Sequence, residues 1–173
     1  MKKTKLFLVA ALITAFVSTN VTYAFQIVQT FPAMYENRVN LFNDDQIILI
    51  NDKEHTIPAT VYYSEPAGSL MVPIRYICIA LGLPEGAVKW DSANSSITID
   101  AGRRIIWMQI GASHYYLNGT LTPILSDGGD IGIVEIKENR AYVPYNTIAE
   151  ALHISVELTK DGSGIIYNAP KIK

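Results

Sequence analysis

Two segments of the chain follow one pattern and restrict its fold more than any other feature. They are MVPIRYICIALGL at 71–83 and YVPYNTIAEALHI at 142–154, and in each a Val-Pro pair precedes apolar residues spaced three or four apart. That spacing predicts a helix that buries one face. Proline is favoured at the first helical position, so Pro73 and Pro144 predict the two helix starts. Gly82 can adopt the left-handed conformation that ends a helix.

β-Hairpins are expected directly after both helices, because the apolar period changes there from about 3.6 to 2. These hairpins span 88–99 and 156–167. Two further hairpins are expected upstream, with turns at 51–52 (Asn-Asp) and 118–119 (Asn-Gly). The predicted fold is therefore α+β, with an antiparallel sheet twisted around short helices and two related hairpin-helix-hairpin units in one domain.

The segment that joins the two units contains the longest expected strand, RRIIWMQIG at 103–111. Further along the chain, LSDGGDIGIV at 125–134 has no counterpart in the first unit and is expected to be a glycine-rich loop. Trp90 alternates with Val88, which predicts a place in the core for both.

The N-terminal residues have the pattern of a secretory signal peptide. Three lysines precede an apolar run from Leu6 to Val17, and small residues stand before an expected cleavage after Ala24. A membrane-spanning helix needs roughly 20 apolar residues, more than this run offers. We expect 1–24 to be removed, 25–45 to be a lead-in without clear periodicity, and 46–168 to form the domain.

Composition excludes several classes of protein. Hydrophobic residues make up 49% of the chain and charged residues 17%, as in a globular domain. The net charge of −2 and the absence of a basic run beyond the first five residues argue against nucleic acid as a partner. A single cysteine, Cys78, excludes an intramolecular disulfide, so the fold depends on its core.

The segment MVPIRYICIALGLPEGAVKWDSANSSITI resembles the copper amine oxidase N-terminal-like domain, also called the stalk domain. The family pattern is a Val-Pro-Leu-Arg helix, Ala-Leu-Gly, Val-x-Trp-Asp, a Thr/Ser-rich turn and an Ile-x-Ile strand. The matching residues are Val72, Pro73, Arg75, Ala80, Leu81, Gly82, Val88, Trp90, Asp91, Ile97 and Ile99. The second copy departs from the pattern, with Asn146 in place of the arginine and His153 in place of the glycine. The resemblance extends over 46–167.

The resemblance implies a five-stranded antiparallel sheet twisted around a helix, found in exported proteins of mainly Gram-positive bacteria. It also implies an accessory, non-catalytic role, because copper and the quinone cofactor of amine oxidases belong to a separate catalytic domain. The Asn-Tyr-Asp/Glu stretch that gives rise to the quinone is absent from this sequence. We therefore expect no cofactor and no metal.

The residues that could support catalysis or metal binding are scattered. His55, His114 and His153 occur singly, which favours surface or capping roles over metal ligation. Cys78 lies on the apolar stripe of the first helix, where a thiol packs as a small hydrophobic group with a raised pKa. The carboxylates of DGGD at 127–130 could bind calcium, but this pattern is more typical of a turn.

Arg75 and two tyrosine pairs are the candidate partner-binding residues. Arg75 could face a ligand, although we favour a structural role in which its stem covers apolar surface and its guanidinium pairs with Asp91 or strand carbonyls. The pairs are Tyr62 and Tyr63, and Tyr115 and Tyr116. Neighbouring strand residues point to opposite faces, so one tyrosine of each pair is expected outside, where it could stack on sugars, anchor a protein or pair across strands.

These observations predict a non-catalytic exported module that contacts cell-wall polymer or a surface or secreted protein. Its location would be secreted or on the cell surface, with membrane contact only during export. One alternative is a regulatory or inhibitory partner of a secreted enzyme. The other is a small secreted hydrolase assembled from Arg75, Asp91, His114 and Asp130.

Overall fold

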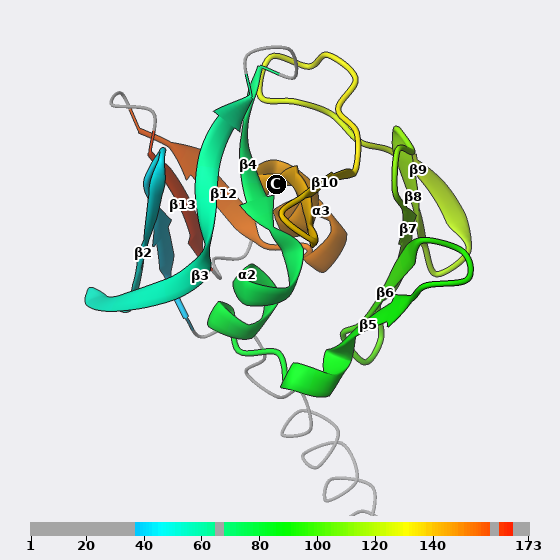
Figure 1. Ribbon diagram of the computed structural model, residues 1–173, viewed down its shortest axis with the longest axis horizontal. Coiled ribbons are helices and arrows are strands. Elements are labelled where there is room, and N and C mark those ends of the chain that lie inside the picture. The colour runs from blue at the N-terminus through cyan, green and yellow to red at the C-terminus, as the bar shows by residue number, and fades with distance from the viewer. Residues whose placement is uncertain (1–36, 65–67, 160–162, 168–173) are drawn as a thin grey trace, which may run out of the picture. The chain divides into compact units, whose positions relative to one another are not determined.

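The computed structural model describes residues 37–64, 68–159 and 163–167, all of which belong to one compact unit (Figure 1). The predicted signal peptide, 1–24, lies outside the described residues, as does most of the lead-in. Within the described part of the chain, no helix is long and apolar enough to cross a membrane.

Over the described residues the fold is mostly β, with two antiparallel sheets and two short helices. The eight-stranded sheet has the order β10-β11-β4-β3-β2-β1-β13-β12 and the five-stranded sheet the order β5-β6-β7-β8-β9. The eight strands are β1 (Val39–Leu41), β2 (Asp45–Ile50), β3 (Lys53–Ser64), β4 (Ser69–Pro73), β10 (Glu135–Lys137), β11 (Arg140–Pro144), β12 (Ser155–Leu158) and β13 (Gly164–Tyr167). The five are β5 (Val88–Asp91), β6 (Ser96–Asp100), β7 (Ile105–Gln109), β8 (His114–Leu117) and β9 (Thr120–Pro123). Helices α2 (Ile74–Ala80) and α3 (Tyr145–Leu152) lie between the sheets in Figure 1, and a 3₁₀ turn, η1 (Glu85–Ala87), leads into β5.

Both predicted helices form, each starting one residue later than expected. Pro73 and Pro144 occupy the N-cap position, with ψ of 109° and 136°, and are also the last residues of β4 and β11. A proline can hold both places because its missing N–H is needed neither by the strand end nor by the first helical turn.

The two helices end in the same way. Gly82 has φ 105°, and the N–H of the next residue, Leu83, donates to the carbonyl of Cys78 at 3.0 Å. His153 has φ 62°, and the N–H of Ile154 donates to the carbonyl of Ala149 at 2.8 Å. The prediction for Gly82 is confirmed, and a histidine holds the equivalent left-handed position after α3.

The two Val-Pro pairs lie side by side near one edge of the eight-stranded sheet, where β4 and β11 are the third and second strands. Strands β4 and β11 are antiparallel neighbours, with Val72 opposite Val143 and a proline at the end of each strand. Each strand also closes a hairpin, β3–β4 and β10–β11, immediately before its helix. The sequence interpretation missed the turn of β10–β11, where Glu138 and Asn139 have positive φ values of 51° and 58°.

All four predicted hairpins are confirmed, but they are divided between the two sheets. The turns at 51–52 and 118–119 join β2 to β3 and β8 to β9. Hairpin β5–β6 belongs to the five-stranded sheet, whereas β12–β13 belongs to the eight-stranded sheet. The architecture therefore differs from a single five-stranded sheet around one helix, since α2 and α3 both contact β4 and β11 of the larger sheet.

The longest described strand is β3, with 12 residues, so the prediction of 103–111 was wrong. Strand β3 pairs with β2 before and after a register shift, up to Val61, and its last three residues pair with β4. Pro58 lies in the stretch where the register with β2 shifts. Proline is tolerated at such a bulge because no ladder hydrogen bond is required there. Segment 103–111 contributes β7, of five residues, in the middle of the smaller sheet.

The core joins both helices to strands from the two ends of the described chain. Strand β1 falls within the predicted lead-in, yet Val39 and Leu41 are fully buried and pair with both β2 and β13. Cys78 is also fully buried, as predicted from its helical phase. The helix residues that are buried are Ile74, Ile77, Cys78, Ala80, Tyr145, Thr147, Ile148, Ala149, Ala151 and Leu152.

Candidate functional site

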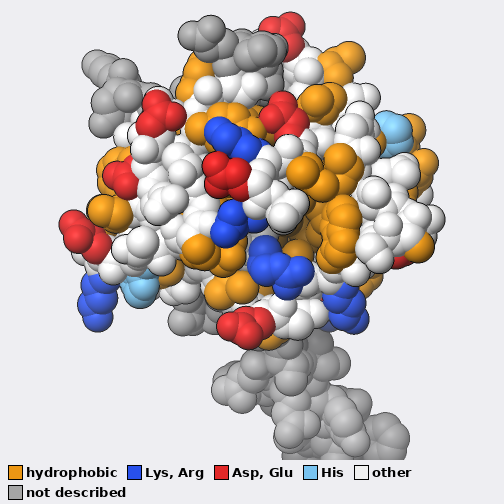
Figure 2. Space-filling model, viewed as in Figure 1, with side chains coloured by type: hydrophobic (Ala, Val, Ile, Leu, Met, Phe, Trp, Pro, Cys, Tyr) orange, Lys and Arg blue, Asp and Glu red, His pale blue; other side chains and the backbone are white. Residues whose placement is uncertain are grey.

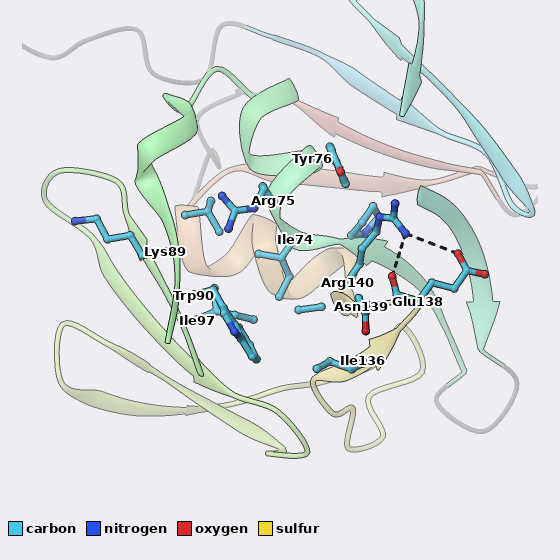
Figure 3. Close-up of a pocket in the computed structure, with 13 residues that line it drawn as sticks. Ile74, Arg75, Tyr76, Lys89, Trp90, Ile97, Ile136, Glu138, Asn139 and Arg140 are labelled. Carbon is cyan, nitrogen blue, oxygen red and sulfur yellow. Dashed lines mark hydrogen bonds and ion pairs between the residues drawn. The ribbon is translucent and has the colours of Figure 1, made fainter. Parts of the chain in front are cut away.

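A cleft of about 570 Å³ lies where the start of α2, hairpin β5–β6 and the turn of β10–β11 meet (Figure 3). The Val-Pro end of β4 brings α2 to this place, and η1 then leads the chain into β5 along the opposite wall. The cleft is lined by Pro73, Ile74, Arg75, Tyr76, Val88, Lys89, Trp90, Ile97, Ile136, Glu138, Asn139, Arg140 and Ala141.

Trp90 is the main aromatic surface of this cleft. Its side chain is 45% exposed, although Val88, two residues earlier on the same face of β5, is buried. The prediction that Trp90 belongs to the core was therefore wrong. Alternation gave the correct face of the strand, but beyond Val88 that face borders the cleft, and Figure 3 shows Trp90 across from Ile136 of β10.

The cleft is positively charged in a chain of net charge −2. Arg75 and Arg140 line it together with one carboxylate, Glu138, which leaves a formal charge of +1. Lys89, between Val88 and Trp90 on β5, points away from the cleft in Figure 3. Arg140 Nη1 donates to the Glu138 carbonyl at 3.0 Å and lies 3.9 Å from a carboxylate oxygen of the same residue. Since both side chains are partly exposed, this ion pair is weak and leaves Arg140 able to bind an anion. Figure 2 shows basic side chains gathered beside a hollow bordered by hydrophobic ones.

Arg75 does not make the contacts that its favoured structural role required. Its side chain is exposed, and among the described residues it has no ion pair or hydrogen bond through its guanidinium. The expected partner, Asp91, is engaged in its own turn, where it accepts hydrogen bonds from Asn94 Nδ2 at 2.6 Å and the Ala93 N–H at 2.9 Å. These bonds, that from Asn94 first, lower the pKa of Asp91. The predicted pairing of Arg75 with Asp91 was wrong.

Tyr62 and Tyr63 lie on β3, away from the cleft. Tyr62 is half-buried; its hydroxyl donates to Glu135 at 2.7 Å, and the ammonium of Lys137 stands 3.6 Å from the centre of its ring. Burial, followed by the hydrogen bond to Glu135, raises the pKa of Tyr62 above its usual range. Tyr63 points outward and is the exposed member of the pair. Tyr62 thus ties β3 to β10 within the chain.

Tyr115 and Tyr116 lie on β8 of the other sheet, so the four tyrosines do not form one patch. Tyr115 is buried, whereas Tyr116 lies on the outer face. The centre of the Tyr116 ring is 5.6 Å from that of Trp107 and 5.8 Å from that of His114. The aromatic residues that share the cleft with Arg75 are instead Tyr76 and Trp90. The sequence interpretation singled out neither of them for binding.

The predicted pieces of a hydrolase are not brought together. Neither of the two pockets described for this chain contains more than one of Arg75, Asp91, His114 and Asp130. The described residues contain no group of three or more His, Cys, Asp or Glu that could hold a metal ion. Burial raises the pKa of the Cys78 thiol to about 12, which makes it a poor nucleophile.

Comparison with known proteins places the chain in a class of accessory domains. Residues 49–167 match the family model of the copper amine oxidase N-terminal domain, the same family that the sequence motifs resemble. The chain therefore belongs to the copper amine oxidase N-terminal domain family. Such domains are typically accessory, non-catalytic modules, and no catalytic family matches the chain. Neither a curated protein nor a solved structure matches it significantly.

Proposed function

We propose that this protein is a non-catalytic module, exported by a Gram-positive bacterium, that binds an anionic polymer of the cell wall in the cleft of Trp90, Arg75 and Arg140. The observation that carries the proposal is an exposed tryptophan that shares a cleft with two arginines. Among the described residues Arg75 has no ion pair, and Arg140 has only the weak one with Glu138. Export is supported by the sequence pattern of 1–24. The two related hairpin-helix-hairpin units would then serve as a rigid support for the cleft.

The chemistry of the cleft suits a sugar polymer that carries phosphate or carboxylate groups. A tryptophan ring offers a flat apolar face on which a sugar ring can stack. Guanidinium groups bind phosphate and carboxylate through paired hydrogen bonds. The apolar wall formed by Ile97 and Ile136 keeps water away from these contacts, which strengthens them.

The experiment uses the fluorescence of Trp90, which is one of two tryptophans in the chain. In the Trp107→Phe variant, Trp90 is the only indole, so a change in emission reports the cleft alone. The variant is titrated with soluble wall fragments, before and after extraction of their phosphate-bearing polymers. We expect saturable quenching by the intact fragments that weakens as salt is raised, because the contacts are ionic.

The matched variants are Trp90→Ala and Trp107→Ala, compared by sedimentation with isolated cell walls. Loss of the stacking ring in Trp90→Ala should weaken binding about tenfold, in line with roughly 1–3 kcal/mol for an aromatic stacking contact. Trp107 lies on the outer face of the five-stranded sheet, so Trp107→Ala should bind like the wild type. Equal binding by both variants, or no retention on walls by the wild type, would refute the proposal.

A protein partner is the second candidate, and one observation favours it. The loop at 125–134 exposes several large apolar side chains, of which Ile131 is 71% exposed. Exposed apolar side chains in a small region are typical of a protein contact, such as that of a regulatory or inhibitory partner of a secreted enzyme. Retention of a secreted protein by the wild type, lost in Ile131→Ser but kept in Trp90→Ala, would select this function.

A further inference from the structure

Among the described strands, four lie at the edges of the two sheets, and one of them differs from the rest. The edges are β10 and β12 in the larger sheet and β5 and β9 in the smaller one. Three of them carry charged side chains, namely Glu135 and Lys137 in β10, Glu157 in β12, and Lys89 and Asp91 in β5. Strand β9 is Thr-Leu-Thr-Pro and carries none. Because charges on an edge strand discourage pairing with another chain, β9 is the edge that is left able to pair.

The backbone of Leu121 points a donor and an acceptor toward the open side of β9. The N–H of Ile124 donates to the Ser113 carbonyl at 2.8 Å, and bonded pairs alternate with non-bonded pairs along an antiparallel ladder. Leu121 stands opposite Tyr116, three steps along this ladder, so it falls in a non-bonded pair. Its N–H and C=O therefore point away from β8, to the side where no described strand lies. Pro123 has the same orientation, so its missing N–H costs the hairpin nothing.

The side chain of Leu121 extends an apolar row to this edge. The strand register places Trp107 of β7 opposite Tyr116 of β8, and Tyr116 opposite Leu121. Residues opposite each other share a face of the sheet, so all three lie on its outer face. Leu121, at the open end of the row, is 57% exposed. A strand added beside β9 would cover this leucine and continue the row.

We propose that β9 pairs with β9 of a second copy of this chain, with the strands antiparallel and a two-fold axis between the two Leu121 residues. In a hydrogen-bonded antiparallel pair, the two residues exchange both of their N–H···O=C bonds. The outward N–H and C=O of Leu121 can make this exchange with the same groups of the second copy, as a two-fold interface requires. The two leucine side chains then meet on the outer face. Since β9 is uncharged, the two copies bring no like charges together there.

Pro123 limits the possible registers of this pairing. A pairing centred on Pro123 is excluded, because proline has no N–H to exchange with its counterpart. A pairing centred on Thr122 would set Leu121 opposite Pro123, which gives one hydrogen bond in each such pair and leaves the two leucines apart. The register centred on Leu121 is therefore the one that joins both the backbone groups and the apolar side chains. An interface of one short strand buries less than about 1,200 Å², so the association should be weak.

The test is sedimentation velocity of the full chain at about 10 μM to 1 mM, the range in which weak association becomes populated. The wild type should shift from monomer to dimer as its concentration rises. Leu121→Lys places like charges opposite each other across the axis, so it should remain monomeric. The matched control is Ile105→Lys, which changes a 41% exposed side chain on the same face but on β7, two strands from the edge. It should dimerise like the wild type, and circular dichroism shows whether both variants are folded.

A mixture of two variants tests the two-fold axis itself. Leu121→Glu should also be monomeric alone, whereas its equimolar mixture with Leu121→Lys should contain heterodimers, because opposite charges then face each other. The proposal is overturned if the wild type stays monomeric, even if β9 pairs with a strand of another protein. It is also overturned if dimers persist in Leu121→Lys, or if the mixed variants do not associate. No residue of β9 lines the cleft, so this result is independent of the proposed binding to walls.

Discussion

His153 is in a backbone conformation that should cost the protein stability, and this can be measured. The residue has φ 62° and ψ 45° after α3, the left-handed region in which a side chain crowds the following carbonyl. That conformation costs a residue other than glycine about 1–2 kcal/mol, whereas a glycine loses about 0.5–1 kcal/mol more backbone entropy on folding. The substitution His153→Gly should therefore stabilise the protein by about 0.5–1 kcal/mol.

The surroundings of His153 support this magnitude. Its side chain is exposed, so little packing is lost with it. The hydrogen bonds that close the helix, from the N–H groups of His153 and Ile154 to carbonyls of α3, are made by the backbone and persist in the variant. For a unit of this size the gain corresponds to about 2–4 °C in Tm. Urea unfolding followed by circular dichroism gives the free energy directly.

Two further variants identify the cause. His153→Ala removes the imidazole but keeps the crowded Cβ, so it should give no gain. Gly82→Ala places a Cβ at the equivalent residue after α2, where φ is 105°, and should cost about 1 kcal/mol or more. If His153→Ala stabilises the protein as much as His153→Gly, the imidazole and not the backbone is responsible, and the reasoning is refuted.

Two other residues give sharp predictions. Gly132→Ala would place a Cβ 2.9 Å from side-chain atoms of both Ile124 and Pro144, so it should cost about 1–3 kcal/mol in urea unfolding. Gly128→Ala, with no atom nearer than 3.8 Å, should change stability by less than about 0.5 kcal/mol, and a similar loss in both would contradict the packing argument. Cys78 is buried and the pKa of its thiol is raised to about 12, so it should not react with a thiol reagent between pH 7 and 9 unless guanidinium is present. Rapid native reaction that increases with pH as for a free thiol would show that the thiol is accessible.

Local signals account for what the sequence predicted well. The helices, the four hairpins and the buried place of Cys78 depend on residues within about ten positions of one another. Proline, glycine and the Asn-Gly turn restrict the backbone directly, and apolar spacing reports which face is buried. These features can therefore be predicted without knowing how distant segments of the chain pack together.

The features that were missed depend on contacts between distant segments. The pairing of β4 with β11 joins residues about 70 positions apart, and no short-range pattern specifies it. Strand β3 continues through Pro58, and only the register shift in its pairing with β2, which no local pattern predicts, makes the proline acceptable. Trp90 was assigned to the correct face of β5, but alternation cannot tell whether another element covers that face. The cleft was missed for the same reason, since its walls come from three separate parts of the chain.

The difference between Arg75 and Asn146 acquires a physical meaning from the two pockets. Each is the second residue of its helix, yet Arg75 lines a cleft of formal charge +1 and Asn146 a pocket with two carboxylates and no basic side chain. The equivalent residue of the two helices therefore lines a different cavity in each unit, and the two cavities have opposite charge. Substitutions at the two residues should then have separate effects. Arg75→Asn should weaken binding to walls, because it removes a cation from the cleft. Asn146→Arg changes the other pocket and should bind to walls like the wild type. Equal loss of wall binding in both variants would mean that the cleft is not the site of binding.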